Sequence, residues 1–307
     1  MVDFLESIRP HIRGKIVAQA PLAAQSWFRV GGAAEWLFRP ADLEDLALFL
    51  RLCPQSIAIT CIGAASNLLI RDGGVEGVVI RLPAAFGNVT VKDTTIIAGA
   101  AALDTTVAQT ALQYHITGFE WMIGVPGTIG GAIAMNAGAY GADMSQLVQK
   151  VQAVTRNGDV IWLEKTDTTF SYRHCHWPND LIFVAAEMKG HIGDASAIAN
   201  SMQHIRQQRE ETQPVKSRTG GSTFANPTIA ESGGKKAWEL IDAVGCRGLA
   251  IGDASISTKH CNFMINNGNA TAENLEKLGE TVRLKILEET GVHLHWEIKR
   301  LGKRAES

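Results

Sequence analysis

Two loops of small residues carry the most recognisable chemistry in this sequence. Residues 63–67, Gly-Ala-Ala-Ser-Asn, directly follow a short β-branched run, and residues 124–141 form a long, uncharged, glycine-rich segment. Small side chains let backbone N–H groups approach an oxyanion, and Ser66 and Asn67 add side-chain donors. A loop as long as the second is uncommon as a mere connector. Both loops are therefore candidate phosphate cradles, and the longer one has room for a planar or extended ligand.

The glycines of these loops allow a second interpretation, in which they mark tight turns and close strand packing. Seven of the 30 glycines lie between Gly118 and Gly141, and others stand at Gly63, Gly220 and Gly221. This concentration favours the first interpretation, that the glycine excess chiefly leaves room for ligands.

Several familiar nucleotide and catalytic motifs are missing from the sequence. No G-x-G-x-x-G follows a strand, no G-x-x-x-x-G-K-[ST] occurs and no G-x-S-x-G is present, so a Rossmann site, a P-loop and a hydrolase serine are unsupported. The segment His174-Cys175-His176 holds metal-ligating side chains, but its spacing matches no standard zinc pattern. An incidental strand or loop is favoured there, and we expect no metal.

Composition narrows the class of protein further. The chain has 307 residues, 46% of them hydrophobic, and a net charge of −2, which is typical of a globular protein and indicates neither disorder nor nucleic-acid binding. The five scattered cysteines include no C-x-x-C and suit reduced thiols in a cytoplasm. Residues 121–142 are uncharged, but their glycines and Pro126 argue against a membrane span.

The elements that must position the two loops are predicted from hydrophobic periodicity. Asp42 is the expected N-cap of the first helix, Asn157-Gly158 the expected hairpin turn and Gly291 the expected end of the last helix. Alternation in the last strand places Glu297 on its polar face. Strands are predicted at residues 34–39, 57–62, 68–70, 77–82, 89–92, 95–98, 147–155, 160–163, 181–188 and 292–301, and helices at 43–52, 103–115, 194–209, 235–244 and 272–290.

Six segments, in order along residues 20–301, resemble the UDP-N-acetylenolpyruvoylglucosamine reductase family, the MurB flavoenzymes of peptidoglycan precursor synthesis. Any one segment is a weak signal, whereas six in the same order are specific. The segments are WFRVGG (27–32), GAASNLLIRD (63–72), GVPGTIGGAIAMNAGAYG (124–141), GGSTFANP (220–227), STKHCNFMIN (257–266) and the final strand with Glu297.

The resemblance implies an α+β fold. A two-unit FAD-binding region of the vanillyl-alcohol oxidase (PCMH-type) class would be followed by a C-terminal α+β substrate-binding domain. We expect FAD-binding subdomains at residues 1–84 and 85–205, a substrate-binding domain at 206–301 and a tail at 302–307. The implied cofactor is non-covalent FAD, with NADPH as reductant and a UDP-sugar enolpyruvyl ether as substrate. We expect a cytoplasmic monomer that acts in cell wall biogenesis.

Three residues match the family's catalytic positions. Arg173 matches an arginine over the substrate carboxylate, which a guanidinium can bind through two donors. Ser222 matches the proton donor; serine is a feeble acid and works only against a strongly basic carbanion within hydrogen-bond reach. Glu297 matches a glutamate that stabilises or protonates the enolate, and as an acid it would need a pKa raised by burial. Without the resemblance, an ordinary loop arginine and an ordinary turn serine are favoured for Arg173 and Ser222, and the alternative for Glu297 is a solvated strand glutamate paired with His295 or Lys299.

Together with the two loops, the resemblance assigns residues that bind cofactor and substrate. The cofactor-binding residues are Gly63, Ala64, Ala65, Ser66, Asn67 and Leu68 in the first loop and Gly124, Val125, Pro126, Gly127, Thr128, Gly130, Gly131, Asn136, Ala137 and Gly138 in the second. The substrate-binding residues are Tyr172, Asn226, Lys259 and Asn266.

The sequence departs from the family pattern in two places. Some members carry an insertion with a substrate-binding tyrosine; this chain has only Tyr114, Tyr140 and Tyr172 and therefore resembles the shorter class. Ala65 stands where a second glycine usually precedes SNLLIRD, and alanine is small enough for the phosphate approach to survive. Two other functions stay open: an FAD oxidase or dehydrogenase of the same fold, and a non-catalytic nucleotide-binding module.

Overall fold

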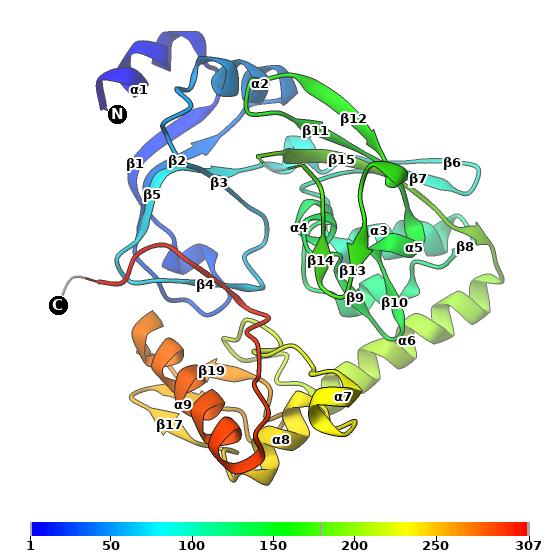
Figure 1. The fold of residues 1–307 in the computed structure, drawn as a ribbon. Helices are drawn as coiled ribbons and strands as arrows, with labels where there is room; N and C mark the ends of the chain where they lie inside the picture. Colours follow the sequence, from blue (N-terminus) through cyan, green and yellow to red (C-terminus); the bar gives the residue numbers. More distant parts are fainter. Residues whose placement is uncertain (1, 179, 306–307) are drawn as a thin grey trace. The chain divides into compact units, whose positions relative to one another are not determined.

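A computed structural model describes residues 2–178 and 180–305 (Figure 1). Contacts divide the described chain into two compact units. Unit 1 comprises the chain up to Ala18, then Trp36–Ala64 and Gly77–Gln208. Unit 2 comprises Gln19–Glu35, Ala65–Glu76 and the chain from Arg209 onward. The domain boundaries expected at residues 84 and 205 stay a prediction.

The helices and strands follow one another throughout both units. The α-helices are α1 (Val2–Ile8), α2 (Leu43–Leu52), α3 (Asp104–Gln113), α4 (Ile129–Ala134), α5 (Met144–Leu147), α6 (Ala195–Thr212), α7 (Ile229–Ser232), α8 (Ala237–Ala243) and α9 (Ala272–Thr290). The 3-10 helices are η1 (Arg9–His11), η2 (Ala23–Gln25), η3 (Ala84–Phe86), η4 (Glu120–Gly124) and η5 (Lys165–Asp167). The strands are β1 (Lys15–Pro21), β2 (Ala33–Arg39), β3 (Ile59–Ile62), β4 (Leu68–Ile70), β5 (Val75–Arg81), β6 (Val89–Lys92), β7 (Thr95–Gly99), β8 (Ile116–Thr117), β9 (Gly138–Ala139), β10 (Ala142–Asp143), β11 (Val148–Val154), β12 (Val160–Glu164), β13 (Phe170–Ser171), β14 (His174–Cys175), β15 (Ile182–Lys189), β16 (His191–Ile192), β17 (Ala250–Ile251), β18 (Ala254–Ile256), β19 (Met264–Asn266) and β20 (Lys299–Leu301).

Helix α2 and the parallel pair β3 and β5 form the N-terminal part of unit 1. Asp42 caps α2 as predicted, because its carboxylate accepts a hydrogen bond from the Asp45 N–H at 3.0 Å. The apolar face of α2, with Leu46 and Phe49, packs into one buried cluster that also includes Val184 of β15. This shared core joins the N-terminal part of unit 1 to its second sheet.

The second sheet of unit 1 has five antiparallel strands in the order β12-β11-β15-β7-β6. Strand β15 alternates between buried and half-buried residues, as a strand with one face on the core should. Helices α3 and α4 contact this sheet, and Figure 1 shows them on one side of it. Their packing brings the glycine-rich segment onto the sheet.

Unit 2 combines a three-stranded antiparallel sheet, β17-β18-β19, with helices α8 and α9. Thr271 and Asn274 form a capping box at the start of α9, and Gly291 ends the helix in a left-handed conformation, as predicted. Strands β4 and β20 pair in parallel in the same unit. The core of unit 2 gathers Phe28, Leu278 and Ile298 with neighbouring apolar side chains.

The predicted strand at residues 292–301 is wrong in its extent. The expected alternation is present, since Val292, Leu294 and Ile298 are buried, but only β20 pairs as a strand. The preceding segment makes an isolated bridge between Trp296 and Phe224 instead. Alternation reports which side chains face the core, whereas strand pairing also needs a partner over several residues.

Candidate functional site

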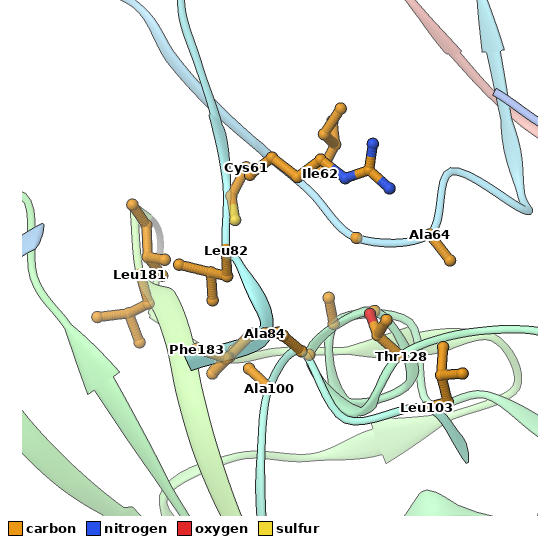
Figure 2. Close-up of a pocket in the computed structure, with 17 residues that line it drawn as sticks. Cys61, Ile62, Ala64, Leu82, Ala84, Ala100, Leu103, Thr128, Leu181 and Phe183 are labelled. Carbon is orange, nitrogen blue, oxygen red and sulfur yellow. The ribbon is translucent and has the colours of Figure 1, made fainter. Parts of the chain in front are cut away.

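A cavity of about 460 Å³ lies within unit 1, a volume in the range of small-molecule sites (Figure 2). Its walls come from the end of β3 and the loop after it, from residues around Ala100, from the start of α4 and from the start of β15. In Figure 2, Ala64 lies on the wall across the cavity from Thr128 and Ala100. The lining residues are Cys61, Ile62, Gly63, Ala64, Arg81, Leu82, Ala84, Ala100, Ala101, Leu103, Thr128, Gly130, Gly131, Ala134, Leu181, Ile182 and Phe183.

Five residues predicted to bind cofactor line this cavity, and they come from both cradle loops. The first loop contributes Gly63 and Ala64, and the second contributes Thr128, Gly130 and Gly131. Sequence reasoning missed the other lining residues, although Cys61 and Ile62 immediately precede the first loop. Leu103, Leu181 and Phe183 lie in the predicted helix 103–115 and the predicted strand 181–188, where apolar periodicity does not distinguish a cavity wall from a filled core.

The cavity wall is mainly apolar, with one guanidinium among the lining residues. Arg81 is half-buried, and burial, followed by the nearby Arg39, lowers the pKa of its guanidinium. Apolar walls suit a flat ring system, and an arginine suits a phosphate or diphosphate.

Most glycines of the two loops are required by close packing, so the expectation that they chiefly leave room for ligands is wrong. A Cβ on Gly63 would lie 2.4 Å from Thr128 Oγ1, and one on Gly130 would lie 3.0 Å from Ala100 Cβ. Gly124 would meet the Tyr140 ring at 2.6 Å. By contrast, Gly131 has its nearest atom at 3.7 Å. The glycines mainly allow neighbouring segments to pack closely, and these closely packed segments form the cavity wall.

The remaining predicted residues of the glycine-rich segment are absent from the cavity lining. Gly138 packs against the backbone of Ala142 and the side chain of Asp143, and Ala137 is buried. The amide of Asn136 is held within the protein by Asp143, Ser145 and Ser171. Val125, Pro126 and Gly127 are likewise outside the lining. The segment expected to be one long loop also contains α4.

Asp104 is a buried carboxyl that the sequence did not single out. It is 1% exposed at the start of α3, and within the described part of the chain neither carboxyl oxygen has a hydrogen-bond partner. A Cβ on Gly127 would lie 2.6 Å from its Oδ2. Burial raises the pKa of Asp104 to about 8, so the group holds its proton at neutral pH.

The free energy of unfolding of the wild type should fall as the pH rises, and we expect the Asp104→Asn variant to lack this fall. An unfolded Asp has a pKa of about 3.9, so between pH 4 and 8 the unfolded state releases a proton that the folded state keeps. The wild type is therefore most stable below the unfolded pKa and loses this stability as the pH rises through 8. From pH 5 to pH 8 the loss is at most about 4 kcal/mol, at about 1.4 kcal/mol per pH unit. Urea unfolding at four pH values would measure it, and parallel profiles for the two proteins would contradict the assignment.

Ser222 and Glu297 lie on neighbouring backbone segments of unit 2. The N–H of Glu297 donates to the carbonyl of Thr223 at 2.9 Å, and the N–H of Ala225 donates to the carbonyl of His295 at 2.9 Å. Both Ser222 and Glu297 are half-buried. The structure therefore places these two predicted catalytic residues on adjacent backbone segments, although they are far apart in the sequence.

The backbone around Ser222 is open on one side and packed on the other. Gly221 has a φ of +79°, which favours glycine, and a Cβ there would meet no atom within 4 Å. A Cβ on Gly220 would lie 2.3 Å from the Phe28 ring. Here one glycine leaves space, as the sequence predicted, and its neighbour is needed for packing.

The rest of the first cradle loop belongs to unit 2 and supports the Glu297 segment. Asn67 Nδ2 donates to the Glu297 carbonyl at 3.2 Å, and the Asn67 carbonyl accepts from the Lys299 N–H at 3.0 Å. Leu68 continues into β4, and Ser66 is half-buried. Ala65 has a φ of +53°, a left-handed conformation that explains why glycine would be favoured at this position.

The predicted substrate residues of unit 2 have different surroundings. Asn266 is 4% exposed and its amide bonds to the carbonyl of Phe28 and the N–H groups of Gly268 and Ala270, so it holds the fold. The exposed Asn226 accepts a hydrogen bond from the first N–H of α8. Lys259 is exposed and its Nζ donates to the carbonyl of Glu210.

Arg173 and Tyr172 form the tip of a short hairpin in unit 1, between β13 and β14. The Arg173 guanidinium carbon lies 5.2 Å from the centroid of the exposed Tyr172 ring. Arg173 has a φ of +56° and is half-buried. In the same hairpin region the rings of His174 and His176 lie 4.2 Å apart.

Among residues 2–178 and 180–305, no three or more His, Cys, Asp or Glu side chains are grouped so that they could hold a metal ion. Across the same stretches, no helix is both long and apolar enough to span a bilayer.

Comparison with known families gives two matches. Residues 34–164 match the FAD binding domain model, and residues 213–301 match the model for the C-terminal domain of UDP-N-acetylenolpyruvoylglucosamine reductase. The chain is 52% identical over 293 residues to the reductase of that name from Rhodospirillum rubrum, covering 95% of this chain and 92% of the relative. It is 50% identical over 295 residues to the one from Gluconobacter oxydans, covering 96% and 95%.

Solved structures agree with this fold. The MurB reductase from Thermus caldophilus matches with a TM-score of 0.80 and 30% identity over 95% of this chain and 100% of that chain. The 6-hydroxy-D-nicotine oxidase from Arthrobacter nicotinovorans matches with a TM-score of 0.55 and 11% identity, over 94% of this chain and 89% of that one, and shows a shared fold alone. The predicted α+β class, with an FAD-binding region and a C-terminal α+β domain, is confirmed.

Proposed function

Because the chain belongs to the UDP-N-acetylenolpyruvoylglucosamine reductase family and is an FAD-dependent oxidoreductase, we propose that it uses NADPH to reduce UDP-N-acetylglucosamine enolpyruvate to UDP-N-acetylmuramate. The observation that best supports this proposal is the cavity of unit 1, whose wall combines Gly63 and Ala64 of one cradle loop with Thr128, Gly130 and Gly131 of the other. A non-catalytic module would have no need of the catalytic side chains Ser222 and Glu297 on adjacent segments.

The residues around the cavity fit part of an FAD molecule. Leu82, Leu103 and Phe183 offer apolar surface to a ring system, and Arg81 offers a cation to a diphosphate. Gly131 leaves backbone accessible beside Thr128. Bound FAD supplies the two-electron carrier between NADPH and the methylene carbon of the enolpyruvyl group.

In this proposal Arg173 binds the substrate carboxylate. Once the methylene carbon has accepted hydride, negative charge develops on the neighbouring carbon and its carboxylate. A guanidinium stays charged and can hold both carboxylate oxygens, which stabilises that charge more than a single ammonium donor can. The Tyr172 ring, 5.2 Å away, limits the directions that this guanidinium can take.

Ser222 donates the proton to the enolate carbon in this proposal, and Glu297 stabilises the enolate or shares in its protonation. Serine is a weak acid, so the transfer needs a short, fixed approach and a strongly basic carbon. The open space beside Gly221 supports access of substrate to the Ser222 backbone. Lys259, Asn226 and Tyr172 are proposed substrate contacts, Lys259 with the diphosphate.

The proposal also places the enzyme in the cytoplasm as a monomer. Its five cysteines are all free thiols, in keeping with a reducing compartment.

The assay that tests the function follows NADPH oxidation with and without UDP-N-acetylglucosamine enolpyruvate. Purified protein should be yellow, release flavin on denaturation, and oxidise NADPH faster when the substrate is present. A flavin that is reduced by another small substrate without NADPH would favour an oxidase instead. Colourless protein that cannot be reconstituted with FAD would contradict any flavoenzyme function.

A further inference from the structure

Asn136 ends the turn after α4 in a conformation that few residues adopt. Its φ is +46°, in the left-handed region where asparagine is tolerated better than most side chains. The residue is 2% exposed. A buried amide must find hydrogen-bond partners inside the protein, so its partners indicate what it does.

The side chain of Asn136 makes three hydrogen bonds, all to protein atoms. Its Nδ2 donates to Asp143 Oδ2 at 3.2 Å and to the Ser171 carbonyl at 3.0 Å, and its Oδ1 accepts from the Ser145 N–H at 3.1 Å. Both amide protons are used in this way. The amide therefore has no donor left for a cofactor.

The Ser171 carbonyl stands immediately before the turn that carries Arg173. The hairpin has only two residue pairs, Phe170 with Cys175 and Ser171 with His174. So short a hairpin does not hold its shape alone in water. Its base is packed by the Phe170 ring, edge-on to Trp177 at 5.8 Å. The Asn136 amide holds the pair nearest the tip.

Helix α4, which precedes Asn136, lies against β14, the second strand of the hairpin. The Asn136 side chain bonds to Ser171 on the first strand. The segment that ends at Asn136 therefore contacts both strands, the first through the Asn136 amide and the second through α4.

We propose that Asn136 is a positioning residue that fixes the tip of the β13–β14 hairpin and so directs Arg173 toward the substrate carboxylate. This inference rests on the proposed function of Arg173. It replaces the sequence-based prediction that Asn136 binds the cofactor. It gives this asparagine a role only in the second half-reaction, the reduction of the substrate, and none in the first, the reduction of the flavin by NADPH.

The Asn136→Gly variant tests the inference with little backbone cost, because glycine accepts the left-handed conformation. FAD content and the rate of flavin reduction by NADPH should stay within about twofold of wild type. Reoxidation by substrate should slow about 10- to 100-fold, the range expected for losing one well-placed interaction with a charged group. Added to Arg173→Lys, the same change should slow the reaction less than about twofold further, because both act through one guanidinium.

The matched control is Ser145→Ala. Ser145 Oγ donates to Asp143 Oδ1 in the same network, but its loss leaves the bond from Asn136 to Ser171 in place. This control should keep wild-type rates in both half-reactions. Amide hydrogen exchange should accelerate at residues 171–175 in Asn136→Gly and not in Ser145→Ala, and this measurement needs no substrate.

Three results would each overturn the inference. They are unchanged amide hydrogen exchange at residues 171–175 in Asn136→Gly, loss of FAD from that variant, and additive effects of Asn136→Gly and Arg173→Lys. A failure of the proposed function gives a different result from a failure of this inference. If the proposed function is wrong, the wild type shows no substrate-dependent NADPH oxidation, while the exchange measurement still reports on the hairpin.

Discussion

The Ser222→Ala variant should keep flavin reduction by NADPH and lose reduction of the substrate by about 100- to 10,000-fold, the range for removal of a general acid. A methyl group cannot donate a proton to the enolate carbon, yet it occupies nearly the same space as the hydroxymethyl group. Ser222 is half-buried and its backbone is held by the bridge to Phe263, so the segment should keep its conformation. Stopped-flow measurements of the two half-reactions would separate the effects.

The neighbouring hydroxyl provides the matched control for this variant. Thr223 is fully buried and, among the described residues, its Oγ1 has no hydrogen-bond partner. Thr223→Val removes that hydroxyl without changing the shape of the side chain, and both half-reactions should proceed as in wild type. If Ser222→Ala slowed both half-reactions equally, Ser222 would be a structural residue.

The Arg173→Lys variant should reduce substrate turnover about 10- to 100-fold and raise the KM for the enolpyruvyl substrate. The lysine keeps the charge but replaces two parallel donors by one point charge, and hydrogen bonds to charged groups are worth about 1.5–3 kcal/mol. The half-reaction with NADPH should be unaffected, because no substrate carboxylate takes part in it. Steady-state kinetics with varied substrate concentration would measure both parameters.

Arg247→Lys is the control for this second prediction. Arg247 pairs with Asp242 at 2.6 Å, and both side chains are partly exposed, so the exchange should leave both half-reactions unchanged. Wild-type kcat and KM in Arg173→Lys would show that Arg173 does not hold the carboxylate.

Elements with a local signal were predictable from the sequence, and those that depend on distant partners were not. Asp42 and Gly291 mark helix ends through their own side chain or lack of one, and the structure confirms both. The antiparallel pair β11 and β12 confirms the hairpin at Asn157-Gly158. The predicted range of the final strand is too long, because the pairing of this strand depends on β4, which is far away in the sequence.

The residues of the candidate site show the same difference between local signals and dependence on distant partners. Small residues such as Gly63 and Gly130 indicate that another group lies close to the backbone. The sequence does not say whether that group belongs to the protein or to a ligand, and here it is mainly protein. Asparagines are more ambiguous still, because their amides satisfy buried backbone as readily as a ligand. Asn136 and Asn266 both bond to the protein's own carbonyls. Only the three-dimensional neighbours separate these possibilities.

The core of unit 2 has a consequence for how the protein is made. Phe28 and Leu69 share one buried cluster with Leu294 and Ile298, which lie far away in the sequence. During synthesis on the ribosome, the two early side chains emerge long before their partners exist. They stay unburied until Leu294 and Ile298 have also emerged, so this core cannot close before segments far apart in the sequence are both available. A fragment limited to residues 213–301 would lack Phe28, Leu69 and strand β4, and should not fold by itself.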